Sequence, residues 1–178
     1  MPARSTESRY GSVAIAFHWL SAALVLAMIL IGMRLDDLAD PGARLTLLRV
    51  HAGLGLTVLA VTLARLLWRL TDRKPGPPAG MSGLEWCAAR TAHVLLYLLL
   101  LGILGSGLTT VLMGGALEAL TGVPGAALPA DFGHVAAREV HGTLAWSFTG
   151  LLLLHLGAAL HHHWVRRDEV LRRMCWGG

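Results

Sequence analysis

Four histidines stand inside long apolar stretches of this 178-residue chain. His141 and His155 lie fourteen residues apart in the run 140–165, which is long enough to cross a bilayer. Fourteen residues of α-helix make nearly a whole number of turns and rise about 21 Å. The two imidazoles therefore share one helix face, each near one side of a membrane about 30 Å thick. Ionisable side chains at such depth are costly and indicate a functional site.

Composition places the chain among small helical membrane proteins. It is 54% hydrophobic and 15% charged, and its mean hydropathy is +0.58. A water-soluble domain is usually less apolar and more charged. The net charge of +4 would suit a protein that binds nucleic acid. However, the basic residues are spread over the ends of the apolar stretches, so we expect no nucleic-acid partner. Cys87 and Cys175 form neither a C-x-x-C nor a C-x-x-C-H pattern, so we expect free thiols and no covalently attached haem.

The apolar runs predict an all-α integral membrane protein with a single transmembrane domain over residues 1–178. The expected helices cover about 12–34, 46–70, 90–112 and 139–165. Four spans place both termini on one side of the membrane. Eleven of the fifteen Lys and Arg residues fall on that side. The positive-inside rule therefore predicts a multi-pass membrane protein with both termini in the cytoplasm.

The other two histidines match the first two by depth. His18 lies near the cytoplasmic side of the first span, level with His155. His51 lies near the outer side of the second span, level with His141. Each pair comes from two different helices, which is how cofactor sites in helical bundles are built. Two imidazoles can hold one haem iron from both faces of the ring, so we expect a four-helix bundle with two b-type haems stacked across the membrane.

Glycines follow the histidines closely. Gly53 and Gly55 come after His51 and would leave room for a flat porphyrin. Two axial histidines fill the coordination of the iron, so electron transfer is favoured over oxygen activation. A structural zinc site is less favoured, because it needs four ligands close together.

The remaining histidines allow more than one interpretation. His93 lies at the depth of the cytoplasmic pair, so depth alone permits it as a ligand; otherwise it lies beside the haem or at a quinone site. His134 falls in a loop, where we expect it to be solvated. Residues 161–163 are three consecutive histidines. Their side chains point in different directions on a helix, so they cannot chelate one ion together. His162 shares the face of His155, seven residues before it, and could hydrogen-bond a quinone or a haem propionate.

Several segments together resemble the bacterial cytochrome b561 family, four-helix dihaem b-type cytochromes of the inner membrane. The resemblance covers nearly the whole chain, and its most specific element is the spacing of the histidines in the fourth span. The supporting segments are Phe17-His18-Trp19, Val50-His51-x-Gly-x-Gly, Arg65-Leu-Leu-Trp-Arg69, His93-x-x-x-Tyr97 and His162-His163-Trp164-Val-Arg166-Arg167-Asp168. Carried over to this sequence, the family's axial ligands are His18, His51, His141 and His155.

Within the family the chain most resembles superoxide oxidase, in which superoxide gives an electron on the periplasmic side and ubiquinone is reduced. The resemblance implies that Arg138 and Arg49 steer superoxide toward the periplasmic haem by their positive charge. The alternative partners of these arginines are the haem propionates or the carboxylates of Asp36, Asp37 and Glu139. One arginine can serve in both ways.

At the cytoplasmic end, His162, Trp164 and Arg167 are the candidates for a ubiquinone site. The expected partners are then membrane lipid, quinone and superoxide, without an obligate protein partner. Two alternatives stay open. The first is a cytochrome b subunit that passes electrons between a periplasmic dehydrogenase or hydrogenase and quinone. The second is a non-redox membrane metal binder, which would show no visible spectrum.

Overall fold

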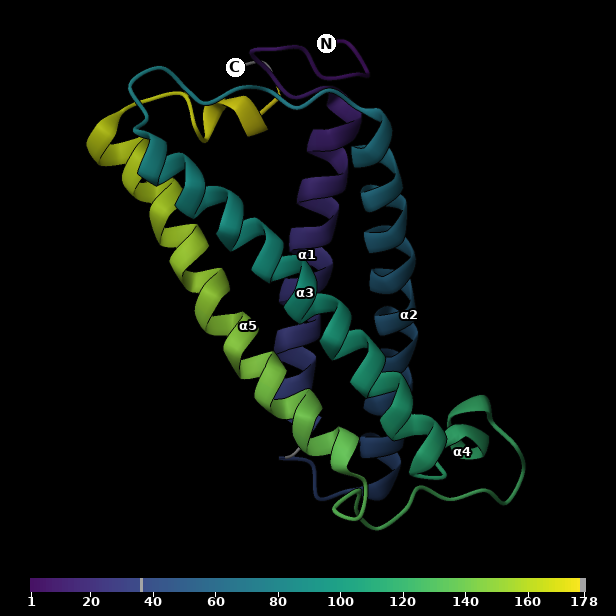
Figure 1. The fold of residues 1–178 in the computed structure, drawn as a ribbon. Helices are drawn as coiled ribbons and strands as arrows, with labels where there is room; N and C mark the ends of the chain where they lie inside the picture. The colour runs from purple at the N-terminus through teal and green to yellow at the C-terminus, as the bar shows by residue number, and fades with distance from the viewer. Residues whose placement is uncertain (36, 177–178) are drawn as a thin grey trace. The chain divides into compact units, whose positions relative to one another are not determined.

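The computed structural model describes residues 1–35 and 37–176, and all regular structure within them is helical. Four described helices are long and apolar enough to cross a membrane, which confirms the expected all-α membrane fold (Figure 1). They are α1 (Ser12–Leu35), α2 (Pro41–Thr71), α3 (Gly83–Met113) and α5 (Ala136–His161), the last of which continues as the π-helix η1 (His162–Arg166). Two shorter elements are α4 (Leu117–Thr121) and the 3-10 helix η2 (Arg172–Met174).

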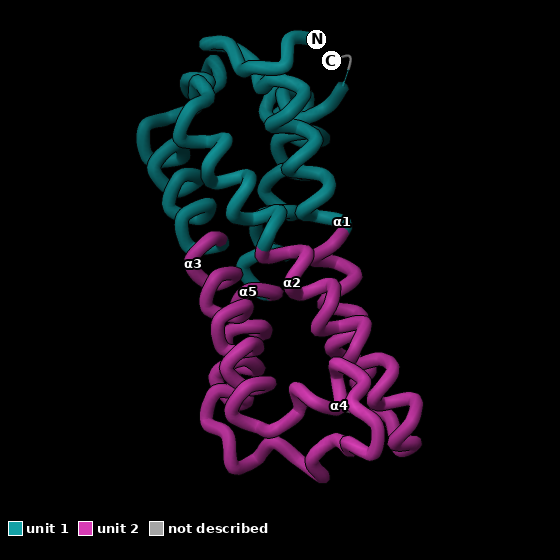
Figure 2. The backbone as a smooth tube through the Cα atoms, turned by 90° about the vertical axis from the view of Figure 1, so that its right-hand side faces the viewer, with its two compact units in different colours: residues 1–23, 60–96, 150–178 teal, residues 24–59, 97–149 magenta. Residues whose placement is uncertain are grey.

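The helices divide into two compact units (Figure 2). Unit 1 contains residues 1–23, 60–96 and 150–178, and therefore both ends of the chain. Unit 2 contains residues 24–59 and 97–149. Each long helix contributes one part to each unit; unit 2 also contains α4, and unit 1 also contains η1 and η2.

Large apolar side chains cover the outside of the helices. Leu70 is 79% exposed and Leu154 is 72% exposed, whereas few apolar residues are buried, among them Ile15 and Phe148. In water such a surface would be costly, but lipid tails solvate it well. Backbone groups in lipid must be satisfied within the segment, and the α-helix does this. The exposed leucines thus agree with four membrane-spanning helices.

Two helices begin earlier than the apolar pattern predicts. The expected starts were about 46 for α2 and about 90 for α3. α2 begins at Pro41, which suits the first helical position, and the Asp40 carboxylate accepts a backbone N–H of the first turn at 2.6 Å. α3 begins with a capping box. The Glu85 N–H donates to the Ser82 hydroxyl at 3.3 Å, and the Ser82 N–H donates to the Glu85 carboxylate at 2.8 Å. The first turns are polar, so apolar periodicity alone misses them.

In unit 1 the N-terminal segment is fastened to the end of α2. The Ser5 hydroxyl and backbone N–H donate to the Asp72 carboxylate at 2.6 and 3.0 Å. The Arg4 guanidinium donates to the Thr71 carbonyl at 3.1 Å and lies 5.8 Å from the ring centre of Trp68. These contacts hold the segment against the helix end.

Replacing Asp72 with Asn should loosen this segment. Burial acts to raise the pKa of the Asp72 carboxyl, but the hydrogen bonds from Ser5 outweigh it and hold the pKa below its ordinary value. The stabilisation is therefore complete above the ordinary Asp pKa of about 3.9 and is lost as the pH falls through the lowered pKa. At pH 7 we expect hydrogen exchange in residues 1–11 to become several-fold faster in D72N.

The matched control is Asp37→Asn, which removes an exposed carboxylate from unit 2. It should leave exchange in residues 1–11 unchanged. Equal exchange in D72N and wild type at pH 7 would contradict the proposed attachment of the segment.

Candidate functional site

Unit 2 brings together His51 of α2 and His141 of α5. Their ring centres are 6.3 Å apart, and both side chains are half-buried. The other two helical segments approach the rings at glycines. A Cβ on Gly107 of α3 would lie 3.0 Å from Cε1 of His141, and one on Gly32 of α1 would lie 3.5 Å from Cε1 of His51. Small residues at these positions let the helices close around the pair.

The ring nitrogens of this pair have different surroundings. Nδ1 of His141 lies 2.9 Å from the Ile103 carbonyl oxygen and 3.5 Å from the Ser106 hydroxyl. A carbonyl only accepts, so Nδ1 carries the proton and Nε2 has a free lone pair. Nδ1 of His51 is buried and has no hydrogen-bond partner among the described residues. Buried polar atoms are normally paired, so this imidazole is suited to a ligand.

Unit 1 brings together three histidines from three helices. The ring centres of His18 on α1 and His155 on α5 are 6.4 Å apart. His93 on α3 lies closer to His155, at 5.2 Å between ring centres. From α2, Arg65 Nη2 donates to Nδ1 of His18 at 3.1 Å. Each helical segment of unit 1 therefore places one nitrogen-bearing side chain in this cluster.

The separation of the rings indicates what each pair can hold. An imidazole nitrogen lies about 1.2 Å from its ring centre and bonds a metal at about 2.0–2.1 Å, so two imidazoles on opposite sides of one metal have ring centres about 6.4 Å apart. The distances of 6.3 and 6.4 Å fit this arrangement, whereas the 5.2 Å between His93 and His155 is too short for it. Among the described residues, no group of three or more His, Cys, Asp or Glu side chains could hold a metal ion. A pair of opposed imidazoles fits a haem iron, whose other positions the porphyrin fills.

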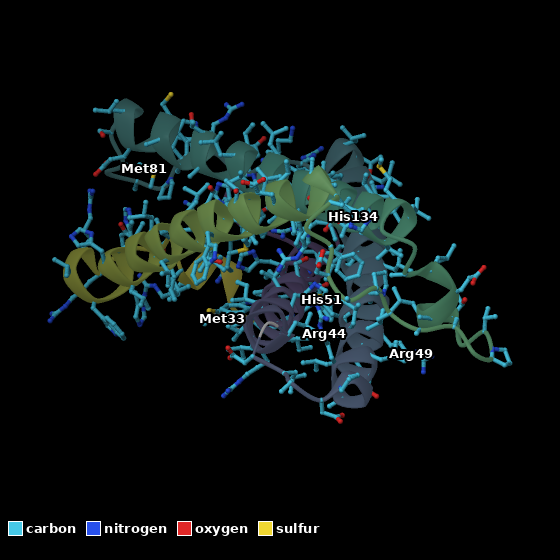
Figure 3. All side chains as sticks on the ribbon, turned by 90° about the horizontal axis from the view of Figure 1, so that it is seen from below. Met33, Arg44, Arg49, His51, Met81 and His134 are labelled. Carbon is cyan, nitrogen blue, oxygen red and sulfur yellow. The ribbon has the colours of Figure 1, made fainter. Side chains whose placement is uncertain are left out.

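Arg49 and Arg44 fasten the connections of unit 2. Nε and Nη2 of Arg49 donate to the Ala119 carbonyl at 3.1 and 2.6 Å, which joins α4 to α2. Arg44 donates to the Ala130 carbonyl at 3.3 Å. Figure 3 shows Arg49 on the side of α2 toward α4 and His51 on the side toward α1. The structure thus gives Arg49 a supporting role that its position in the sequence did not indicate.

Arg138 lies nearer to the histidines. It precedes His141 by three residues on α5 and is close enough to act electrostatically on both rings of the unit 2 pair. Of the carboxylates named above as alternative partners, Asp37 and Glu139 are exposed, and Asp36 lies outside the described residues. Of the two predicted steering residues, Arg138 is the one whose charge acts on the rings of the pair.

The end of α5 places His162 next to a carboxylate. Nδ1 of His162 lies 2.5 Å from Oδ2 of Asp168. Burial acts to raise the pKa of the Asp168 carboxyl, but the hydrogen bonds from His162 and from the Val170 N–H, with the charge of Arg166, hold it below its ordinary value. Arg166 also pairs with Glu85 of α3. The turn that follows α5 is therefore fixed in unit 1 by charged hydrogen bonds.

The other polar residues of this end are more exposed. Trp164 is 66% exposed, and Arg167 is exposed with a backbone φ of 53°. His161 and His163 are exposed as well, and His134 is exposed in the loop before α5. Of the predicted quinone-site residues, only His162 is half-buried and hydrogen-bonded within the described structure.

Arg65 lies beside His18, and the sequence did not lead us to expect it there. A position near the end of an apolar span is typical of a side chain that reaches the membrane interface. Arg65 follows His51 by fourteen residues, the same interval that separates His141 from His155. This interval could have indicated that Arg65 shares the face of α2 that carries His51.

The two glycines predicted to leave room for a porphyrin, Gly53 and Gly55, follow His51 on α2 by about half a turn and about one turn. A Cβ on Gly53 would have no atom within 4 Å, and one on Gly55 would meet only the end of Met28, at 3.6 Å. The glycines that do lie against the rings are Gly107 and Gly32, on the neighbouring helices. Close approach to the pair therefore depends on residues that the sequence pattern around His51 did not indicate.

Comparison with known proteins agrees with these features. The family profile described as prokaryotic cytochrome b561 matches residues 9–177. The chain is 34% identical to cytochrome b561 homolog 2 of Escherichia coli K12, over 96% of this chain and 93% of the relative. It is 27% identical to cytochrome b561 homolog 1 of the same organism, over 94% and 97%. It is 26% identical to the Yersinia pestis protein named "Probable superoxide oxidase CybB", over 94% and 96%.

Gly107→Val should disturb the unit 2 pair selectively. A Cβ there would already be 3.0 Å from Cε1 and 3.1 Å from Nδ1 of His141, so valine must displace the ring. We expect about half of the b-type haem absorbance per protein to be lost. The matched control is Gly105→Val, because a Cβ at Gly105 has no atom within 4 Å. Equal haem content in the two variants would contradict the close packing of α3 against His141.

Proposed function

The chain belongs to the prokaryotic cytochrome b561 family, and we propose that it transfers electrons from periplasmic superoxide, through two b-type haems, to ubiquinone. The family consists of membrane cytochromes with b-type haem, so membrane electron transport is its general function. Its fold is a dihaem four-helix membrane bundle. The identity of the ligands, the electron donor and the electron acceptor are the parts that we propose.

The facing histidine pairs carry the proposal. Their ring-centre distances of 6.4 and 6.3 Å both suit two imidazoles opposed across one iron. We assign His18 and His155 to the cytoplasmic-side haem and His51 and His141 to the periplasmic-side haem. His93 is assigned a place beside the cytoplasmic-side haem and not on its iron, because its ring is only 5.2 Å from that of His155.

The protein's part in this chemistry is to fix the orientation of the imidazole rings and to leave the iron no open coordination position. The Ile103 carbonyl fixes the orientation and tautomer of His141, as partners of metal-bound histidines commonly do. Two imidazoles from each pair would hold one haem iron and would leave no position at which oxygen could bind and be activated. A bound haem supplies reversible one-electron chemistry, and the histidines limit it to electron transfer.

Superoxide is proposed as the donor because a cation lies beside the periplasmic-side pair. Arg138 acts electrostatically on both rings of that pair, and a positive site attracts an anionic radical. The likeness to the Yersinia protein named as a probable superoxide oxidase supports the same substrate. Arg49 is a weaker candidate for steering, because two of its nitrogens already donate to the Ala119 carbonyl.

Ubiquinone is proposed as the acceptor at the end of α5. Nδ1 of His162 lies 2.5 Å from the Asp168 carboxylate, so that nitrogen carries a proton, and Nε2 can donate to a quinone carbonyl when the ring is doubly protonated. Reduction of a quinone takes up protons as well as electrons, and a histidine–carboxylate pair can supply them. Trp164 and Arg167 are exposed near this end and complete the proposed quinone site.

The orientation in the membrane follows from charge. Most of the basic residues belong to the terminal segments and the 65–90 region, and the positive-inside rule places these in the cytoplasm. We therefore propose that unit 1, which contains both termini, is the cytoplasmic-side unit of an inner-membrane protein. Superoxide would then meet unit 2 and quinone would meet unit 1.

A second candidate is an electron carrier with another donor. The relative at 34% identity is named only as a cytochrome b561 homolog, whereas the probable superoxide oxidase is 26% identical. In this case the chain would pass electrons between a periplasmic dehydrogenase or hydrogenase and quinone. Haem ligation would be the same and the donor would differ.

Rapid mixing with superoxide separates the two candidates. We expect a superoxide pulse to reduce the oxidised protein quickly and ubiquinone to reoxidise it. Arg138→Gln should slow the reduction several-fold at low ionic strength and remove most of its salt dependence, because screening weakens attraction between charges. Arg9→Gln, which removes an exposed positive charge from unit 1, should reduce at the wild-type rate.

Slow reduction by superoxide, without salt dependence and unaffected by Arg138→Gln, would exclude superoxide as the donor. Haem spectra in such a protein would still support the second candidate. Absence of b-type bands would reject both.

A further inference from the structure

A groove runs along the exposed face of α3 near the start of this helix, within unit 1. Its volume is about 420 Å³, which is in the range of small-molecule sites. Residues four apart form ridges along an α-helix, so a groove between two such rows follows the helix. The rows here are Trp86, Arg90 and Val94 on one side and Cys87, Thr91 and Leu95 on the other.

The groove changes from polar to apolar along the helix. α3 has 31 residues and is therefore about 46 Å long, which exceeds the hydrocarbon core of about 30 Å. Its first turns, at the end of unit 1 that holds both chain termini, thus reach the head-group layer (Figure 1). Trp86 suits this layer, and Arg90 reaches it by its long side chain. Val94 and Leu95 lie deeper and are 55% and 44% exposed. This order is that of a phospholipid, whose acyl chains lie below its phosphate.

Arg90 brings to the groove a positive charge that no described carboxylate neutralises. Its side chain is exposed and makes no hydrogen bond or ion pair with the described residues. The acidic residue nearest to it in sequence is Glu85, which already accepts from the Ser82 N–H and pairs with Arg166. The exposed hydroxyl of Thr91 also has no hydrogen bond in the described part of the chain. A cation and a hydroxyl at the upper end of an apolar groove suit a phosphate group.

Charge distinguishes an anionic phospholipid from other molecules that could fill the groove. Ubiquinone is uncharged and would leave Arg90 without a counter-ion. A second copy of the chain, docked about a two-fold axis through this groove, would bring two Arg90 side chains together. Unit 1 also exposes Arg73, Lys74 and Arg172, which add to the attraction for anionic head groups.

We propose that this groove binds one anionic phospholipid, with its phosphate on Arg90 and Thr91 and one acyl chain along Val94 and Leu95. Such binding depends neither on the haem ligation nor on the electron donor and acceptor. It differs from the general contact of membrane helices with lipid, because it selects a head group by charge at one position.

Cys87 reports whether the groove is occupied, because its thiol is exposed and lines the groove. The purified protein is placed in bicelles of phosphatidylcholine with or without phosphatidylglycerol, and N-ethylmaleimide labelling of each cysteine is followed by mass spectrometry. A charged bilayer surface affects all nearby thiols, so the rate at Cys87 is divided by the rate at Cys175 of the same unit. We expect phosphatidylglycerol to lower this ratio several-fold.

Each variant is compared with itself in the two lipids. Arg90→Gln should abolish the effect of phosphatidylglycerol, and Arg90→Lys should retain most of it because the charge is restored. Arg172→Gln removes an exposed charge of the same unit outside the groove, so it is the matched control and should behave as wild type.

An equal ratio in the two lipids for the wild-type protein, or an undiminished effect in Arg90→Gln, would overturn the proposal. Two results would replace the occupant and overturn it as well. Protection of Cys87 by ubiquinone in phosphatidylcholine alone would indicate a quinone, and protection that grows with protein concentration would indicate a second copy of the chain.

Discussion

A histidine inside an apolar helix bundle needs partners for its ring nitrogens. The helices of this structure are arranged so that most of these nitrogens have one. An unpaired polar group in such surroundings destabilises the fold, because lipid tails offer it no hydrogen bond. His141 meets a carbonyl, His18 meets Arg65, and Nδ1 of His51 has no described partner. The spacing of the facing rings then leaves room for one iron between the members of each pair. Glycines, caps and interhelical contacts serve to keep those rings in place.

Much of the fold was accessible from the sequence because membrane helices are governed by length and apolarity. The runs of leucine and valine predicted four spans, and all four are helices. The pairing of histidines by depth followed from helix rise alone, and each expected pair lies within one unit. The early starts of α2 and α3 were missed because their first turns are polar. Asp40 with Pro41, and Ser82 with Glu85, were local signals of these starts.

Side-chain contacts across helices were less accessible. Depth could not separate His18 from His93 as the partner of His155, whereas the ring distances in the structure distinguish them. Arg65 and Arg49 both stand near helix ends, where arginines usually reach toward headgroups. Arg65 instead contacts His18, and Arg49 binds the Ala119 carbonyl of a connection seventy residues away. Such contacts depend on how helices are rotated against each other, which hydropathy does not specify.

Low-temperature electron paramagnetic resonance of the oxidised protein tests the opposed-histidine ligation most directly. We predict two low-spin ferric haem signals per chain and no high-spin signal, because each iron has two imidazole ligands. His93→Ala should keep both low-spin signals, whereas His155→Ala should lose one of them. A high-spin signal in the wild-type protein, or the loss of a low-spin signal in His93→Ala, would contradict the assignment of the pairs.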